Sequence, residues 1–142
     1  MKIPVTMVLG LLLLLPAYKH EASQKQSTTE NTQAQQRERE GYVKAIQAKL
    51  DEYDLKLSGL EAKASTLSGP AKEDFRNMIE QLQIQKKGIA SRLTYVRDAS
   101  PDAFTLIKEY VDSTLARVER SYQEVSKKLD TTLASPPRNQ QK

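Results

Sequence analysis

Residues 42–67 read YVKAIQAKLDEYDLKLSGLEAKASTL, and this stretch decides the fold. Apolar side chains recur in it at alternating steps of three and four residues, and mainly charged or small side chains fill the positions between. That spacing is the a/d pattern of a helix that packs along one narrow face in a coiled coil. We expect this first helix over about 37–67. Its predicted core-facing residues are Val43, Ile46, Leu50, Tyr53, Leu57 and Leu60.

Two later segments repeat the same spacing, which predicts helices over about 71–98 and 101–133. The predicted core-facing residues of the second are Phe75, Ile79, Leu82, Ile89, Leu93 and Val96. Those of the third are Phe104, Ile107, Val111, Leu115, Val118 and Tyr122. Lys86 occupies a core-facing position of the second helix. A lysine there normally extends so that its ammonium group reaches water, or it helps to set the helix register.

The boundaries between the helices are marked by Ser68-Gly69-Pro70 and by Ser100-Pro101-Asp102. The glycine suits a left-handed cap, and each proline suits the first turn of the following helix. Short connections make consecutive helices antiparallel neighbours. We therefore predict an all-α fold, an elongated antiparallel three-helix coiled-coil bundle over 37–134. The alternative, a long intermolecular coiled coil, conflicts with both breaks. A bundle this small is only modestly stable alone, so self-association as a dimer is expected.

The first 18 residues are predicted to be a signal peptide. Residues 3–15 form a short apolar segment after a positive start, too short to cross a bilayer comfortably. Cleavage is expected between Ala17 and Tyr18. A buried N-terminal core helix is the weaker alternative. Residues 15–18 resemble a lipoprotein signal box with tyrosine in place of the lipidated cysteine, so we expect no lipid anchor. The protein is expected to be exported, periplasmic or extracellular, or tethered by an uncleaved signal.

Both flanks of the predicted bundle are polar. Residues 19–36 are dominated by Gln, Ser, Thr and Asn, and 135–142 contain two prolines followed by five amide or basic side chains. Segments with so little to bury do not offset the entropy of ordering. We predict a disordered spacer over 19–36 and a disordered tail over 135–142.

The composition disfavours most enzyme chemistry. The 142 residues include no Cys, no Trp, five Gly and one His. The single histidine, His20, lies in the predicted spacer, and a general base needs a defined position. The acids alternate with lysines and arginines as on a solvated helix face. We therefore predict no enzyme activity, no catalytic, cofactor-binding or metal site, and no small-molecule substrate.

A nucleic-acid partner is not expected either. The formal net charge is only +4, and basic and acidic residues alternate along the helices instead of forming one basic surface. An interaction with a protein or lipid surface is harder to dismiss. Amphipathic helices joined by short turns can open and lay their apolar faces on lipid or on an unfolded chain. The leading hypothesis is an exported structural or interaction protein. The alternative is a holdase-like chaperone or lipid-surface binder.

The third helix resembles one in small exported bacterial three-helix coiled-coil proteins, described as stress-response or apolipoprotein-like. The likeness rests on Tyr42-Val43-Lys44 at the start of the first helix, on Ser68-Gly69, and on third-helix residues Ser100, Ala103, Phe104, Ile107, Val111, Leu115, Val118 and Tyr122. It extends from about residue 42 to 133. The resemblance implies a cell-envelope or stress-related helical protein, and it supplies no catalytic or cofactor residues.

Overall fold

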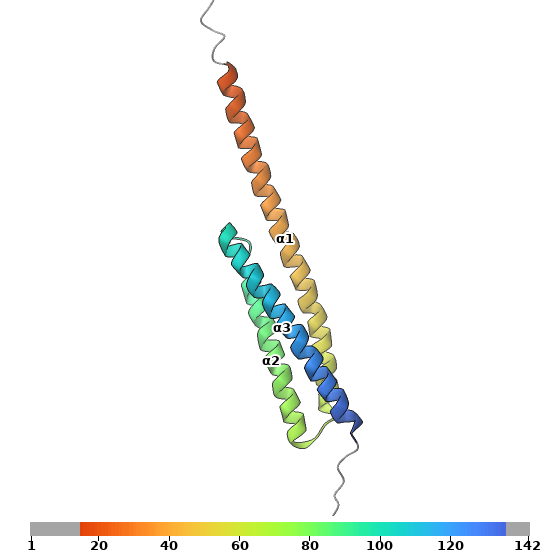
Figure 1. Cartoon of the computed structure of the whole chain (residues 1–142). Helices are drawn as coiled ribbons and strands as arrows, with labels where there is room; N and C mark the ends of the chain where they lie inside the picture. Colours follow the sequence, from red (N-terminus) through yellow and green to blue (C-terminus); the bar gives the residue numbers. More distant parts are fainter. Residues whose placement is uncertain (1–14, 136–142) are drawn as a thin grey trace, which may run out of the picture. The chain divides into compact units, whose positions relative to one another are not determined.

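The computed structural model describes residues 15–135, with side chains from residue 28, and contains three α-helices (Figure 1). They are α1, Leu15–Ser65, α2, Gly69–Leu93, and α3, Pro101–Ala134. The described residues contain no strand. The prediction of an all-α fold is therefore confirmed. The chain divides into two compact units, residues 1–38 and residues 39–142.

The first unit differs from the sequence prediction. Residues 19–36, expected to be a disordered spacer, are helical and belong to α1. Their side chains from residue 28 onward are exposed, as their polarity requires. A helix that is already nucleated extends at little cost, and Gln, Glu, Lys, Arg and Ala are good helix formers. The polar composition therefore predicted the exposure of this segment but not its backbone.

The predicted terminal segments lie mostly outside the described residues. Residues 1–14 of the predicted signal peptide and residues 136–142 of the predicted tail are not described. Ala17 and Tyr18, the predicted cleavage positions, belong to the first turn of α1. Ser135 is the C-cap of α3, and its backbone N–H donates to the carbonyl oxygen of Thr131.

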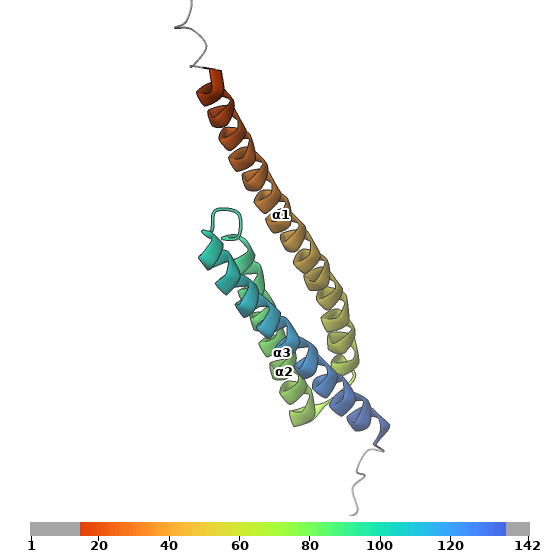
Figure 2. The same cartoon turned by 45° about the horizontal axis from the view of Figure 1, so that its top comes forward.

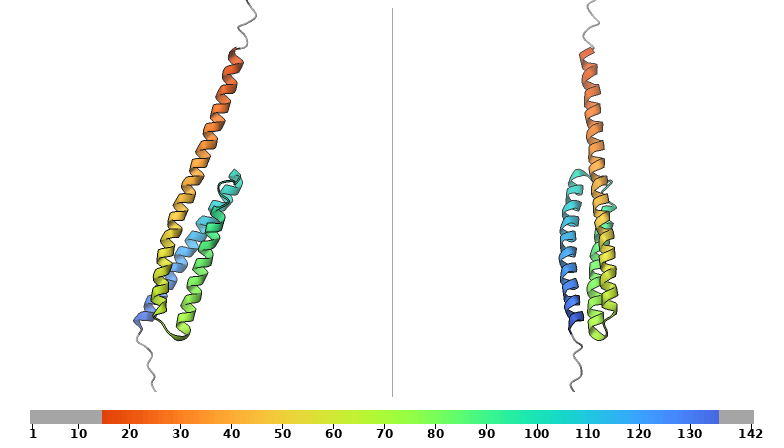
Figure 3. Two further views of the ribbon diagram at one scale, coloured as in Figure 1. Left: turned by 180° about the vertical axis from the view of Figure 1, so that it is seen from behind. Right: turned by 90° about the vertical axis from the view of Figure 1, so that its right-hand side faces the viewer.

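In the second unit the three helices lie side by side as a helical bundle (Figures 1, 2 and 3). One hydrophobic core runs along it and includes Leu50, Leu82, Ile89 and Leu129, which are almost fully buried. All but three of the predicted core-facing residues are buried. The exceptions, Val43, Ile107 and Tyr122, are partly buried and pack against the same core.

The two connections between the helices have the features that the sequence predicts at Gly69 and Pro101. Gly69 has φ of 65°, the left-handed conformation that glycine adopts without a Cβ clash. The Oγ of Ser100 accepts a hydrogen bond of 3.2 Å from the backbone N–H of Ala103. This bond caps α3, and Pro101 begins the helix. The second helix begins at Gly69, two residues before the predicted start, and the third begins at Pro101.

The end of α2 is a correction. The spacing predicted a helix to residue 98, but α2 ends at Leu93. The backbone N–H groups of Tyr95 and Val96 donate to the carbonyl oxygens three residues back, of Arg92 and Leu93, so the chain tightens after the helix end. Val96 remains fully buried, which is why the apolar spacing continues past the helix.

Arg39 of α1 supports this turn. Its Nη1 donates to the carbonyl oxygens of Ala99 at 2.5 Å and Arg97 at 3.2 Å, both beyond the helix end. The guanidinium group also lies 5.2 Å from the centre of the Phe104 ring. Carbonyls that leave a helix need new donors, and an arginine is well suited to provide several.

Candidate functional site

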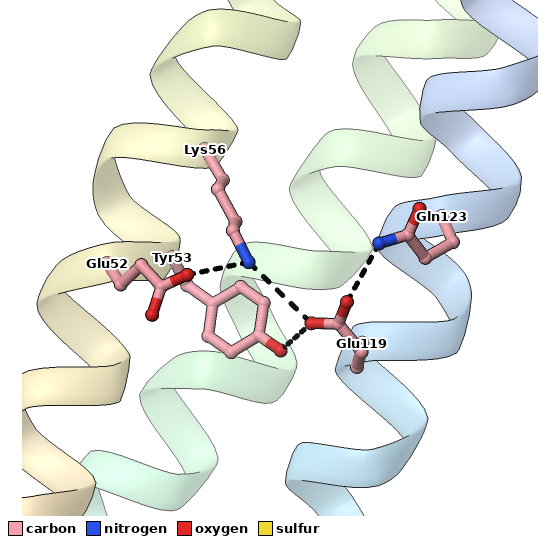
Figure 4. Close-up of polar contacts among 5 residues, drawn as sticks. All are labelled: Glu52, Tyr53, Lys56, Glu119 and Gln123. Carbon is pink, nitrogen blue, oxygen red and sulfur yellow. Dashed lines mark hydrogen bonds and ion pairs between the residues drawn. The ribbon is translucent and has the colours of Figure 1, made fainter.

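The most extensive side-chain network of the second unit joins α1 to α3 around Tyr53 and Glu119 (Figure 4). The ring of Tyr53 belongs to the hydrophobic core, and the residue is only 7% exposed. Its hydroxyl donates to one carboxylate oxygen of Glu119. The other carboxylate oxygen accepts a 2.8 Å hydrogen bond from Nε2 of Gln123. A core tyrosine thus places its polar end on a charged acceptor at the edge of the core.

Lys56 completes the network from the solvent side. Its Nζ lies 2.8 Å from a carboxylate oxygen of Glu52 and 3.8 Å from Glu119. The same ammonium group lies 5.0 Å from the Tyr53 ring centre and 5.4 Å from that of Tyr122. Lys56 therefore contacts two acids and two aromatic faces at once, an arrangement that adds cation–π attraction to the ion pairs.

These contacts move the pKa values of the network away from neutrality. Burial, followed by the hydrogen bond to Glu119, raises the pKa of Tyr53. The hydrogen bonds from Tyr53 and Gln123 lower the pKa of Glu119. The hydrogen bond to Glu52 raises the pKa of Lys56. Each group therefore keeps its ordinary charge near pH 7, whereas a general acid or base works best with a pKa near the working pH.

Other contacts join α1 to α3 on either side of this network. The hydroxyl of Tyr42 donates to Asp112 at 3.2 Å, and its ring meets Phe104 edge to face with centroids 5.7 Å apart. Farther along, Lys63 pairs with Asp130 at 3.0 Å. The α1–α3 contact thus carries three polar links in succession, with aromatic rings beneath two of them.

The α1–α2 contact is also linked. Lys86, the lysine at a core-facing position, is paired with Asp54, and its side chain is 17% exposed. Gln83 donates to Glu61 at 2.5 Å. The expectation that Lys86 extends its ammonium group into water is therefore modified, because a carboxylate of α1 receives it at the surface.

The α2–α3 contact differs from these two. Among residues 28–135, no ion pair or side-chain hydrogen bond connects α2 with α3. A surface depression follows this contact, and its lining includes Gln81, Gln85, Ser121 and Glu124. The Oε1 of Gln85 is buried and has no hydrogen-bond partner. Of the three helix–helix contacts, the one between α2 and α3 therefore has the fewest polar links.

Sequence reasoning missed the Tyr53 network because no single helix contains it. Tyr53 was predicted as a core-facing residue, and Glu119 is one of the acids that alternate with basic residues along the third helix. Each description is correct for its own helix, but neither says which residues meet across helices. The available signal was position: Glu119 directly follows the core residue Val118, and residues flanking a core position are the ones that reach a neighbouring helix. Thr114, buried beside Leu115, was missed as well.

The described residues also lack two kinds of feature. None of their helices combines the length and apolar character needed to cross a bilayer. No group of three or more His, Cys, Asp or Glu side chains among them is placed to hold a metal ion. Comparisons with protein-family models, curated proteins and solved structures found no match to this chain.

Proposed function

We propose that this chain is an exported structural or interaction protein of the cell envelope, non-enzymatic, that works through the outer surface of an elongated antiparallel three-helix coiled coil. The order of the cross-helix contacts supports this arrangement. Along α1, residues 42, 53 and 63 contact residues 112, 119 and 130 of α3, so both series ascend. Residues 54 and 61 contact residues 86 and 83 of α2, so that series runs in reverse.

The observation that carries the proposal is how the side chains are used. Most of the large apolar residues of the three helices meet in one core. The ionisable groups beside that core, such as Lys56 and Glu119, link one helix to another and keep pKa values far from neutrality. A bundle with these cross-helix links presents to partners a rigid surface of defined charge and shape. We place that surface outside the cytoplasm because residues 1–18 have the pattern of an export signal.

The test combines localisation with mass. The full chain is expressed with a C-terminal epitope in a Gram-negative bacterium, and the cells are separated into cytoplasmic, periplasmic and membrane fractions. We expect the epitope in the periplasm, with a mass that corresponds to cleavage after Ala17. A Leu12→Arg variant, which interrupts the apolar run, is the matched control and should remain in the cytoplasm at full mass. Wild-type protein in the cytoplasm at full mass would refute the export proposal.

A second candidate function is a holdase-like or lipid-surface binder. It is favoured by large apolar side chains on the surface of α2, of the turn after it and of α3. Ile84, Tyr95 and Leu106 are each more than half exposed. Co-sedimentation of the purified protein with anionic liposomes, and suppression of aggregation of a denatured test protein, measure this activity. Binding accompanied by hydrogen-exchange protection of α2 and α3 is expected if the candidate is correct. Free protein in both assays at micromolar concentration argues against it.

A further inference from the structure

The outer face of α2 and α3 lies over the one helix contact that has no ion pair or side-chain hydrogen bond among residues 28–135. We propose that this face is a homodimer interface in which a second copy of the chain packs across a two-fold axis perpendicular to the helices. The inference rests on the proposed function as an interaction protein and names one partner, the chain itself.

The first element is a pair of opposite charges on α3. Arg117 and Glu124 are exposed, and neither has an ion-pair partner among residues 28–135. They are seven residues apart and therefore lie on one face of the helix, about 10 Å from each other. That distance prevents them from pairing within one chain. A second α3 in antiparallel orientation, centred between residues 120 and 121, places each arginine against the glutamate of the other copy.

The second element is a large and a small residue on α2. Gln81 is exposed and Gly88, seven residues later, has no side chain. A Cβ at position 88 would meet only the Tyr110 hydroxyl, at 3.4 Å. An antiparallel α2 from a second copy, centred between residues 84 and 85, places Gln81 over Gly88 of the other copy, twice. Ile84, which is 52% exposed, then lies near the axis and meets its own counterpart.

The two centres were obtained from different helices, and they lie at the same level. Gln85 of α2 and Ser121 of α3, the residues beside the two centres, line one surface depression. One axis therefore satisfies both helices. An isologous interface requires that a patch be complementary to itself.

The size of the face predicts a weak dimer. Residues 78–95, which run along α2 into the turn after it, span about 26 Å, and two adjacent helices present a width of about 20 Å. Each copy would then bury about 500 Å², for a total of about 1,000 Å², which is at the lower end of specific interfaces. A dissociation constant of about 1–100 µM is expected. The ion pair between Arg117 and Glu124 occurs twice in the dimer, and it would set the antiparallel orientation of the two copies as much as their affinity.

A charge-swap series tests the proposal by sedimentation equilibrium of the purified chain over about 1–300 µM, a range that brackets the expected dissociation constant. In the Arg117→Glu dimer, a glutamate at position 117 faces Glu124 of the other copy. In the Glu124→Arg dimer, an arginine at position 124 faces Arg117. Each repulsive pair occurs twice. Each single variant should weaken the dimer about tenfold or more. The double variant Arg117→Glu/Glu124→Arg should restore it. The matched control is Lys44→Glu, at an exposed position of α1 that lies away from the proposed interface. It makes the same charge change as Arg117→Glu and should leave the dissociation constant unchanged.

The outcomes separate clearly. A dimer that the single swaps weaken and the double swap restores supports the two-fold axis. A monomer over the whole range, a dimer that tolerates Arg117→Glu, or a double variant that stays weak would overturn it. Liposome or test-protein binding without a dimer would instead assign the face to another partner. A monomer that is still exported would overturn only the dimer and leave the proposed function standing, and circular dichroism confirms that each variant remains helical.

Discussion

Replacing Tyr53 by phenylalanine isolates the hydrogen bond at the centre of the α1–α3 network. The ring remains in the core, so packing against Tyr122 is retained and only the hydroxyl is lost. A hydrogen bond to a charged acceptor contributes about 1.5–3 kcal/mol to stability. The Glu119 side chain is 42% exposed and keeps Gln123 and water as partners, so we reduce this to about 1–2 kcal/mol. Each kcal/mol corresponds to about 4–8 °C in Tm for a domain of this size.

The assay is urea unfolding followed by circular dichroism at 222 nm, at a pH near 7 and fixed protein concentration. The matched control is Tyr95→Phe, which removes the hydroxyl of a tyrosine that is 64% exposed and should change stability by less than about 0.5 kcal/mol. Glu119→Gln and the double variant complete a cycle whose coupling energy should exceed about 0.5 kcal/mol. Equal stabilities for Tyr53→Phe and Tyr95→Phe would refute the reasoning, because burial and the charged acceptor would then have no effect.

Three further predictions follow from the same structure. Because the pKa of Glu119 is lower in the folded state than its ordinary value of 4.5, this carboxylate contributes stability that is present at neutral pH and is lost as the pH falls below that ordinary value. Glu119→Gln should therefore flatten the acid limb in urea titrations from pH 3 to 7. Leu129→Ala should cost about 2–5 kcal/mol in thermal or urea unfolding, whereas the same change at the half-exposed Leu133 should cost far less. Lys86→Leu should leave stability unchanged or raise it by about 1 kcal/mol, since it exchanges a surface pair with Asp54 for apolar packing; a loss above about 2 kcal/mol would contradict this.

The sequence alone was sufficient for the local features of the fold. Steps of three and four residues identify the buried side of each helix because side chains four apart project from the same face. The caps at Ser100 and Gly69 are equally local, since a hydroxyl or a missing Cβ acts within one turn. The end of α2 was placed too late because apolar spacing reports burial, and Val96 is buried without being helical.

What only the tertiary structure decided is which side chains meet across helices. Nothing in residues 42–67 indicates that Tyr53 bonds Glu119, sixty-six positions away, since that pairing depends on the axial offset and rotation of α1 against α3. The same holds for the α2–α3 face, where Gln85 and Ser121 line one depression only after the helices have packed. Periodicity fixes the angle at which a residue leaves its own helix. The core's packing then fixes the register between helices, and the register selects the pairs.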